Sequence, residues 1–181
     1  MKKLFTAFIL GIALAGVSFA QATSRAKGVK TAVVEFTPGA GASAMNDQAK
    51  RGLQTTLSAS LNHTRKFDVY DTRHTRNASQ ANLAAINGNS TAAAVKLGKQ
   101  LGVAYVVTGT VIDYTPKDAA GHGSAEVTVR LIEVVTGKVK YTGNVSVRSG
   151  KPMRTGSQPE MHANVMQHIV DQVTDLLAGK V

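Results

Sequence analysis

Alternating apolar and polar residues near the centre of the chain predict strands that each have one buried face. Val127, Val129 and Leu131 alternate with polar residues, and a similar alternation continues over residues 139–147. Successive side chains point to opposite faces of a strand, so a period of two separates a buried face from a solvent-exposed one. Residues 105–112 are apolar or small on both faces, as expected near the centre of a sheet. These three segments predict an antiparallel meander.

The N-terminal half of the sequence alternates predicted strands with predicted helices. Short strands are expected at residues 30–36 and 67–70. Helical spacing of apolar residues predicts helices at residues 45–61, 72–86, 90–101 and 157–178, of which the alanine-rich 72–86 is the least regular. Strands separated by helices are expected to be parallel. The order β-α-β-α-α-β-β-β-α therefore predicts an α/β fold with a mixed five-stranded sheet and packed helices.

Two of these helices have recognisable ends. Ser90 is suited to cap the helix at 90–101, and Gly102 to terminate it. Ser157 and Glu160 have the spacing of a capping box at the start of the last helix, with Pro159 in the first turn.

The first twenty residues have the pattern of a secretory signal peptide. Lys2 and Lys3 precede an apolar run over residues 4–17, and residues 18–20 have the small-x-small form of a cleavage site. Cleavage before Gln21 is expected, leaving a short polar lead at 21–29 and a single domain at 30–181. The remaining length of about 160 residues suits one hydrophobic core.

Composition narrows the chemistry further. The chain contains no cysteine, so disulfides, thiolate metal sites and lipid attachment at a processed N-terminal cysteine are excluded, and a lipoprotein is not expected. The formal net charge is +10, and removing Lys2 and Lys3 leaves 19 basic and 11 acidic residues, or +8. Such a charge suits a binder of anionic cell-envelope polymer, which is one alternative function. No basic cluster interleaved with aromatic residues is present, so nucleic acid is not expected as a partner.

A second alternative rests on residues 39–44, GAGASA, between a predicted strand and a predicted helix. They fit G-x-G-x-x-A, in which a helix N-terminus binds the pyrophosphate of a nucleotide. Asp68, the candidate ribose-binding acid, lies about 30 residues downstream of Gly39, whereas about 20 are expected. An ordinary loop between strand and helix is the simpler interpretation.

Catalytic and metal-binding patterns are missing from the sequence. The five histidines contain no His-x-x-x-His or His-Glu-x-x-His pair, and no Gly-x-Ser-x-Gly motif occurs. The sequence therefore predicts no catalytic residue, no cofactor and no metal, and the chain is not expected to be an enzyme.

Four segments in order resemble the CsgG family of bacterial envelope proteins, whose relatives include the TolB N-terminal domain and LpoB-type activators of penicillin-binding proteins. They are residues 30–36 (KTAVVEF), 65–70 (RKFDVY), 96–111 (KLGKQLGVAYVVTGTV) and 129–139 (VRLIEVVTGKV). The resemblance covers nearly all of the chain after the signal. It implies a periplasmic, anticodon-binding-like α/β domain that acts without catalysis in secretion, curli-type transport or cell-wall assembly.

The resemblance also implies a partner, which is either an envelope protein or further copies of this chain. The candidate contact surface is the polar face of the meander with Lys140, Asn144 and Arg148, together with the loop that contains Gly39, Gly41 and Ser43. The connections within the meander are too short for added membrane-spanning hairpins, since each such strand needs about 9–11 residues. The chain is therefore not expected to form a pore itself, and no transmembrane segment is expected after the signal.

Overall fold

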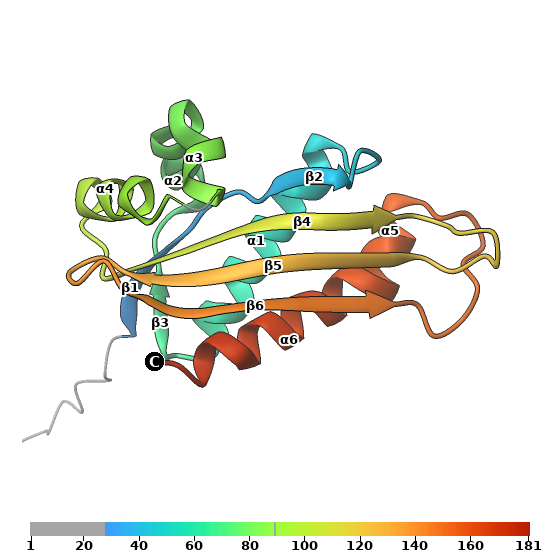
Figure 1. Ribbon diagram of the computed structural model, residues 1–181. Coiled ribbons are helices and arrows are strands. Elements are labelled where there is room, and N and C mark those ends of the chain that lie inside the picture. Colours follow the sequence, from blue (N-terminus) through green and yellow to red (C-terminus); the bar gives the residue numbers. More distant parts are fainter. Residues whose placement is uncertain (1–27, 89) are drawn as a thin grey trace, which may run out of the picture.

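The computed structural model of the protein describes residues 28–88 and 90–181 (Figure 1). The predicted signal peptide and most of the predicted polar lead lie outside the described residues. The described part contains one six-stranded sheet. Its strands are β1 (Val29–Val33), β2 (Thr37–Gly41), β3 (Phe67–Val69), β4 (Tyr105–Thr115), β5 (Ser124–Glu133) and β6 (Val139–Arg148). Its helices are α1 (Asp47–His63), α2 (Thr72–Ser79), α3 (Leu83–Asn87), α4 (Thr91–Leu101), α5 (Gln158–Met161) and α6 (Gln167–Ala178), with a 3-10 turn at Gln80–Asn82 and a π-helical turn, η2, at His162–Met166.

The sheet is mixed, as the sequence predicts. Its strand order is β3-β1-β4-β5-β6. β1 pairs in parallel with β3 and β4, whereas β4, β5 and β6 form the expected antiparallel meander. The α/β fold class is therefore confirmed.

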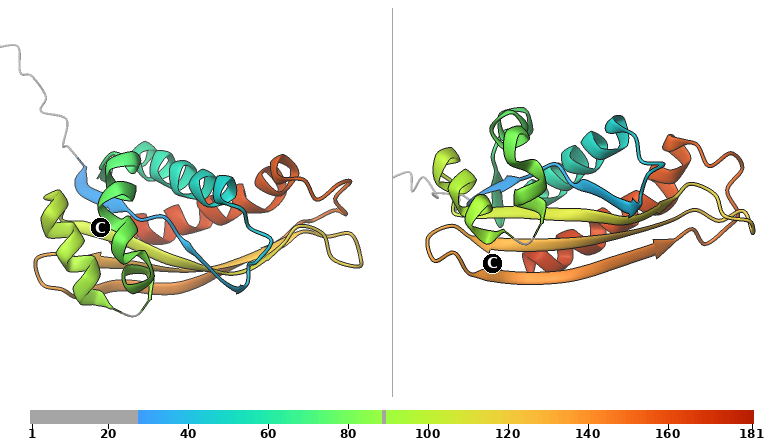
Figure 2. Two further views of the ribbon diagram at one scale, coloured as in Figure 1. Left: turned by 90° about the horizontal axis from the view of Figure 1, so that it is seen from above. Right: turned by 45° about the horizontal axis from the view of Figure 1, so that its top comes forward.

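The main hydrophobic core lies between one face of the sheet and the two long helices α1 and α6 (Figure 2). The helical side of this core includes Leu53, Leu57 and Leu61 of α1 and Ile169 and Val173 of α6. All five are at most 3% exposed, and full burial of such a side chain stabilises the fold by about 1.5–3 kcal/mol. The predicted apolar stripes of both helices thus pack on one face.

The second face of the sheet is only partly covered. A smaller core packs α3 and α4, through Ile86, Ala94 and Leu97, against Val106 and Ile132. Figure 1 shows that α2, α3 and α4 lie over one end of the sheet only. Beyond them, the same face consists of polar residues that belong to neither core, which are Glu126, Thr128, Thr142, Asn144 and Ser146. We call this surface the open face.

Two local differences from the sequence-based expectation have clear causes. Residues 37–41, expected as part of a loop, form β2 and pair in parallel with β4 beyond the point where β1 ends. The expected helix at 72–86 divides into α2, the 3-10 turn and α3. Asn82 leaves helical geometry, with φ −128° and ψ 18°, because this alanine-rich stretch has no continuous apolar stripe to hold one helix against the sheet.

Of the two helices with predicted end signals, one has the expected caps and the other does not. Ser90 caps α4 by accepting a hydrogen bond from the N–H of Ala93, and Gly102 ends it in the left-handed conformation, as expected. The capping box at Ser157 is wrong, because the Ser157 side chain makes no capping bond. The Glu160 carboxylate instead accepts bonds from the N–H groups of residues 154, 155 and 156.

Candidate partner-binding surface

The candidate residues lie on the half of the sheet that contains β2, β4, β5 and β6. β6 forms one edge of this half, and β2 forms part of the other. Three strand spacings of about 4.8 Å put the two edges roughly 14 Å apart. Gly39 and Gly41 on β2 therefore lie across the sheet from Asn144 and Arg148 on β6, within the reach of a single partner.

Asn144 is at the centre of the open face. Its side-chain oxygen accepts a hydrogen bond from the Thr128 hydroxyl at 2.9 Å, and its amide nitrogen donates to the Glu126 carboxylate at 3.2 Å. These contacts join β5 to β6 across the register pair Thr128 and Asn144. The polar face therefore carries side-chain hydrogen bonds that connect β5 and β6.

Lys140 does not share that surface. The register between β5 and β6 shifts between Leu131 and Ile132, so Val139 and Tyr141 are paired and Lys140 is the extra residue of a β-bulge. Its amine lies 3.5 Å from the Glu133 carboxylate. Hydrogen bonding from Thr136, with help from the charge of Lys140, lowers the pKa of Glu133. The expected alternation breaks at Lys140 because the strand contains this bulge.

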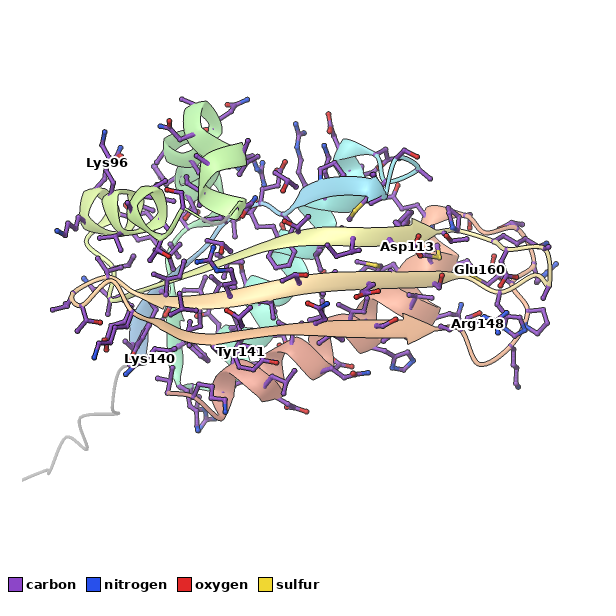
Figure 3. The ribbon with its side chains drawn as sticks, viewed as in Figure 1. Lys96, Asp113, Lys140, Tyr141, Arg148 and Glu160 are labelled. Atoms are coloured by element: carbon purple, nitrogen blue, oxygen red, sulfur yellow. The ribbon has the colours of Figure 1, made fainter. Side chains whose placement is uncertain are left out.

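Arg148 is at the opposite end of β6 from Lys140 (Figure 3). Its guanidinium donates to Asp118 at 2.7 Å. A backbone hydrogen bond from His122 and then the bond from Arg148 lower the pKa of Asp118. Arg148 is therefore already paired with a carboxylate of the β4–β5 connection.

The glycine segment is part of the sheet edge. A Cβ atom on Gly41 would lie 2.7 Å from the carbonyl oxygen of Ile112, so glycine is needed for the close approach of β2 to β4. Ser43 is exposed after the strand ends. α1 begins several residues later, with Asn46 as its cap and Asp47 in its first turn. Residues 39–41 thus serve strand pairing, and an acid occupies the helix start where a phosphate would bind.

The sequence did not indicate that Ile112 is an exposed residue at a β-bulge. The β4–β5 register shifts between Val111 and Asp113, which makes Ile112 the extra residue of a second bulge. Ile112 belongs to neither core and is 41% exposed. The bulge also places Asp113 opposite Glu126 and Tyr114 opposite Ala125. The run of apolar residues from 105 to 112 gave no signal for this bulge.

No group of three or more histidine, cysteine, aspartate and glutamate side chains in residues 28–88 and 90–181 is arranged to hold a metal ion. Within the same residues, no helix has both the length and the apolar character needed to cross a membrane.

The fold and this surface define a mixed α/β domain with one partly uncovered sheet face. Protein CT253 of Chlamydia trachomatis has this fold at a TM-score of 0.61, with 13% identity over 84% of this chain and 97% of that chain. PelC of Paraburkholderia phytofirmans, solved as a dodecamer, has a TM-score of 0.53 and 14% identity over 84% and 86% of the two chains. Lipoprotein GNA1162 of Neisseria meningitidis has a TM-score of 0.53 and 18% identity over 80% and 96%.

LpoB domains, named above as relatives, also match, at TM-scores of 0.46 to 0.48. No protein-family model and no curated protein matches the chain. The three structures with TM-scores above 0.5 establish the shared fold, and membership of the CsgG family remains a prediction.

Proposed function

We propose that this chain is a non-catalytic accessory protein of the bacterial cell envelope, of the CsgG-like class. It is exported to the periplasm without a lipid anchor, and it acts by binding further copies of itself or an envelope protein through the open face and the adjacent edge of β6. It takes part in secretion or cell-wall assembly and does not itself form a pore.

The single observation that carries this proposal is that β6 is a long edge strand of the sheet. This strand has ten residues and, within residues 28–88 and 90–181, pairs on one side only, with β5. An edge strand of this length presents a row of backbone donors and acceptors, which another chain can pair with. β6 contains no proline, and its single lysine lies in the bulge at its start. It therefore has little of the protection that isolated edge strands usually carry.

The solved relatives support self-assembly and an envelope location. PelC was solved as a dodecamer, and GNA1162 is a lipoprotein. The present sequence has no cysteine, so lipid attachment at a cysteine is not part of this proposal.

An anionic-polymer binder is the weaker alternative at this surface. Asp113 and Glu126 lie opposite each other on β4 and β5. Arg148 is paired with Asp118, and Lys140 lies beside Glu133. This arrangement leaves no cluster of unpaired positive charge on the open face. If the positive charge elsewhere binds polymer, that binding should weaken steeply with added salt, because exposed charges are screened.

The test is the mass of the exported, processed protein in solution, measured by light scattering. We expect an oligomer in the wild-type protein and a lower mass for Asn144→Arg, which places an additional charge in the middle of the open face. Val135→Arg is the matched control, because Val135 is 86% exposed in the β5–β6 turn, outside the open face.

A monomeric wild-type protein that also retains no envelope protein after cross-linking would refute the proposed function. Equal masses for the wild-type protein, Asn144→Arg and Val135→Arg would place the contact somewhere other than the open face.

A further inference from the structure

A groove lies between the first half of α1 and the segment that contains α5 and η2. Its main hollow has a volume of about 240 Å³ and is walled by Ala49, Gly52, Leu53, Tyr114, Pro159 and Met166. Gln48, Gln158 and His162 complete the lining. A second hollow of about 120 Å³ shares Ala49, Tyr114 and Gln158 and extends toward Pro116 and Gly156. None of these lining residues is an aspartate, glutamate, lysine or arginine.

The Tyr114 side chain points into this groove because of the bulge at Ile112. Without the extra residue, the alternation from Val107 through Val111 would direct Asp113 toward the core and Tyr114 away from it. The register shift reverses this, so Tyr114 pairs opposite the buried Ala125. Bulges often re-aim a side chain beside a functional site.

The Tyr114 hydroxyl has no hydrogen-bond partner among the described residues. The side chain is 5% exposed, and desolvation alone raises the pKa of Tyr114. The hydroxyl oxygen itself is not fully buried, unlike the unpaired Thr108 hydroxyl, so it borders the open space of the groove. The groove therefore contains one hydrogen-bond donor and acceptor, the Tyr114 hydroxyl, that makes no bond within the described protein.

Gly52 leaves space in the groove where any other residue would fill it. It lies inside α1, where glycine is less favourable than alanine by about 1 kcal/mol. No atom lies within 4 Å of the position that its Cβ would occupy. Close packing therefore does not require glycine here, and its effect is to widen the groove opposite Tyr114.

The opposite wall has an unusual backbone. In η2 the N–H of Gln167 donates to the carbonyl of His162, five residues earlier. Single π-turns within helices are often found at functional sites. Here the turn carries two lining residues, His162 and Met166, and the His162 ring lies 3.4 Å from the Thr56 hydroxyl of α1.

From these observations we propose that the groove binds a small uncharged molecule with an apolar ring or short chain and one polar oxygen that pairs with the Tyr114 hydroxyl. The size suits this class, since a cavity of about 150 Å³ is known to accept benzene. The uncharged lining disfavours an ionised ligand. This site is separate from the open face and does not rest on the proposed function.

A side chain of a partner protein fits the groove less well. Protein interfaces surround such pockets with further apolar contact area. The exposed large apolar residues of the described chain are Tyr70, Ile112, Val135, Val139 and Leu176, and none of them lines the groove. The exposed lining residues of the main hollow are the polar Gln48 and His162 and one small apolar residue, Pro159.

The experiment compares p-cresol with toluene, which share a shape and differ by one hydroxyl. Dissociation constants are measured for the exported, processed protein by titration followed with ¹H–¹⁵N NMR. We expect p-cresol to bind about threefold to tenfold more tightly, the usual net effect of one hydrogen bond. Tyr114→Phe should remove this preference while leaving toluene binding in place. Because the hydroxyl makes no bond within the described protein, Tyr114→Phe should fold normally.

Gly52→Leu fills the hollow and should abolish binding of both probes. Its matched control is Ala59→Leu, which adds the same side chain at an exposed position of α1 and should leave both dissociation constants unchanged. Circular dichroism checks that each variant is folded. Gly52→Ala serves in place of Gly52→Leu if the larger residue does not fold, with a partial loss of affinity expected.

Three results would overturn the proposal. The first is equal affinity of the wild-type protein for the two probes, and the second is unchanged binding by folded Gly52→Leu. The third is a Gly52→Leu variant that binds neither probe and also has a lower oligomer mass than the wild-type protein. The last of these would identify the groove as a contact between protein chains.

Discussion

The Arg76 guanidinium lies 3.1 Å from the Glu35 carboxylate, at the point where the chain passes from β1 to β2. The Nε and Oε2 atoms approach without the alignment of a hydrogen bond, so the pair is held mainly by charge. Arg76 also donates to the Gln54 side chain at 3.1 Å, and Gln54 donates to the Val33 carbonyl at 2.8 Å. The side chains of Arg76 and Glu35 are only 27% and 12% exposed.

This pair predicts a large effect of Arg76→Met on stability. Removing one partner leaves a poorly solvated carboxylate, so we expect the free energy of unfolding to fall by about 2–3 kcal/mol. Urea denaturation followed by circular dichroism measures it. In the double variant Arg76→Met/Glu35→Gln, part of this loss should be recovered, because no unpaired charge remains. Additive losses from the two substitutions would show that the pair is not coupled.

A close contact at Gly109 gives a second stability prediction. A Cβ atom on Gly109 of β4 would lie 2.4 Å from the Phe36 ring and 2.6 Å from the backbone oxygen of Thr128. Phe36 is 1% exposed and cannot move away without disturbing the core. Gly109→Ala should therefore lower the free energy of unfolding by about 1–3 kcal/mol. Gly150→Ala is the control, since no atom lies within 4 Å of that Cβ position, and its unfolding midpoint should not fall.

The sequence predicted most of the fold because burial acts on regular patterns. The alternation of Val127, Val129 and Leu131 places all three in the main core, and the stripe that includes Ile169 and Val173 packs against the same face. A hydrophobic period of two or about 3.6 survives in the folded state wherever the backbone is regular.

The candidate site was less predictable because two bulges interrupt that regularity. One bulge directs Lys140 to Glu133, and the other turns Tyr114 toward the core. A bulge depends on the pairing of two strands that are distant in sequence, so neither strand shows it alone. Gly39 and Gly41 were expected in a loop, and their role in strand pairing depends on contact with Ile112 of another strand.

The left-handed backbone conformation of Arg65 predicts that a glycine at this position stabilises the protein. Arg65 is the one non-glycine residue with positive φ, at 61°, in the part of the chain that the structure describes, and it follows the end of α1. The left-handed conformation costs a non-glycine residue about 1–2 kcal/mol, partly offset by the greater chain entropy of glycine. Arg65→Gly should therefore raise the free energy of unfolding by about 0.5–1 kcal/mol.

A shift of the urea midpoint at constant m-value measures this gain. Arg51→Gly provides a matched control, because Arg51 is an exposed residue within α1 and the same replacement there should destabilise the protein by about 1 kcal/mol. Destabilisation by Arg65→Gly would contradict the strain argument.

The Glu160 carboxylate predicts a pH-dependent contribution to stability. It accepts hydrogen bonds from the backbone N–H groups of Thr155 at 2.9 Å, Arg154 at 2.6 Å and Gly156 at 3.0 Å. These bonds favour the ionised form and lower the pKa of Glu160 from 4.5 to about 2. A folded-state pKa below the unfolded one stabilises the protein above the unfolded pKa, and the stabilisation is lost as the pH falls toward the folded value. The loss is thus expected between about pH 4.5 and pH 2.

Glu160→Gln removes this contribution, because a neutral amide is a weaker acceptor for the three N–H groups. The variant should melt at a lower temperature than the wild-type protein at pH 7. The difference between their melting temperatures should shrink as the pH falls below about 4.5, since the wild-type carboxylate then becomes protonated. Thermal denaturation of both proteins across pH 7 to 2 measures this difference. A difference that stays constant over the whole range would mean that the carboxylate charge does not hold the 154–156 segment against α5.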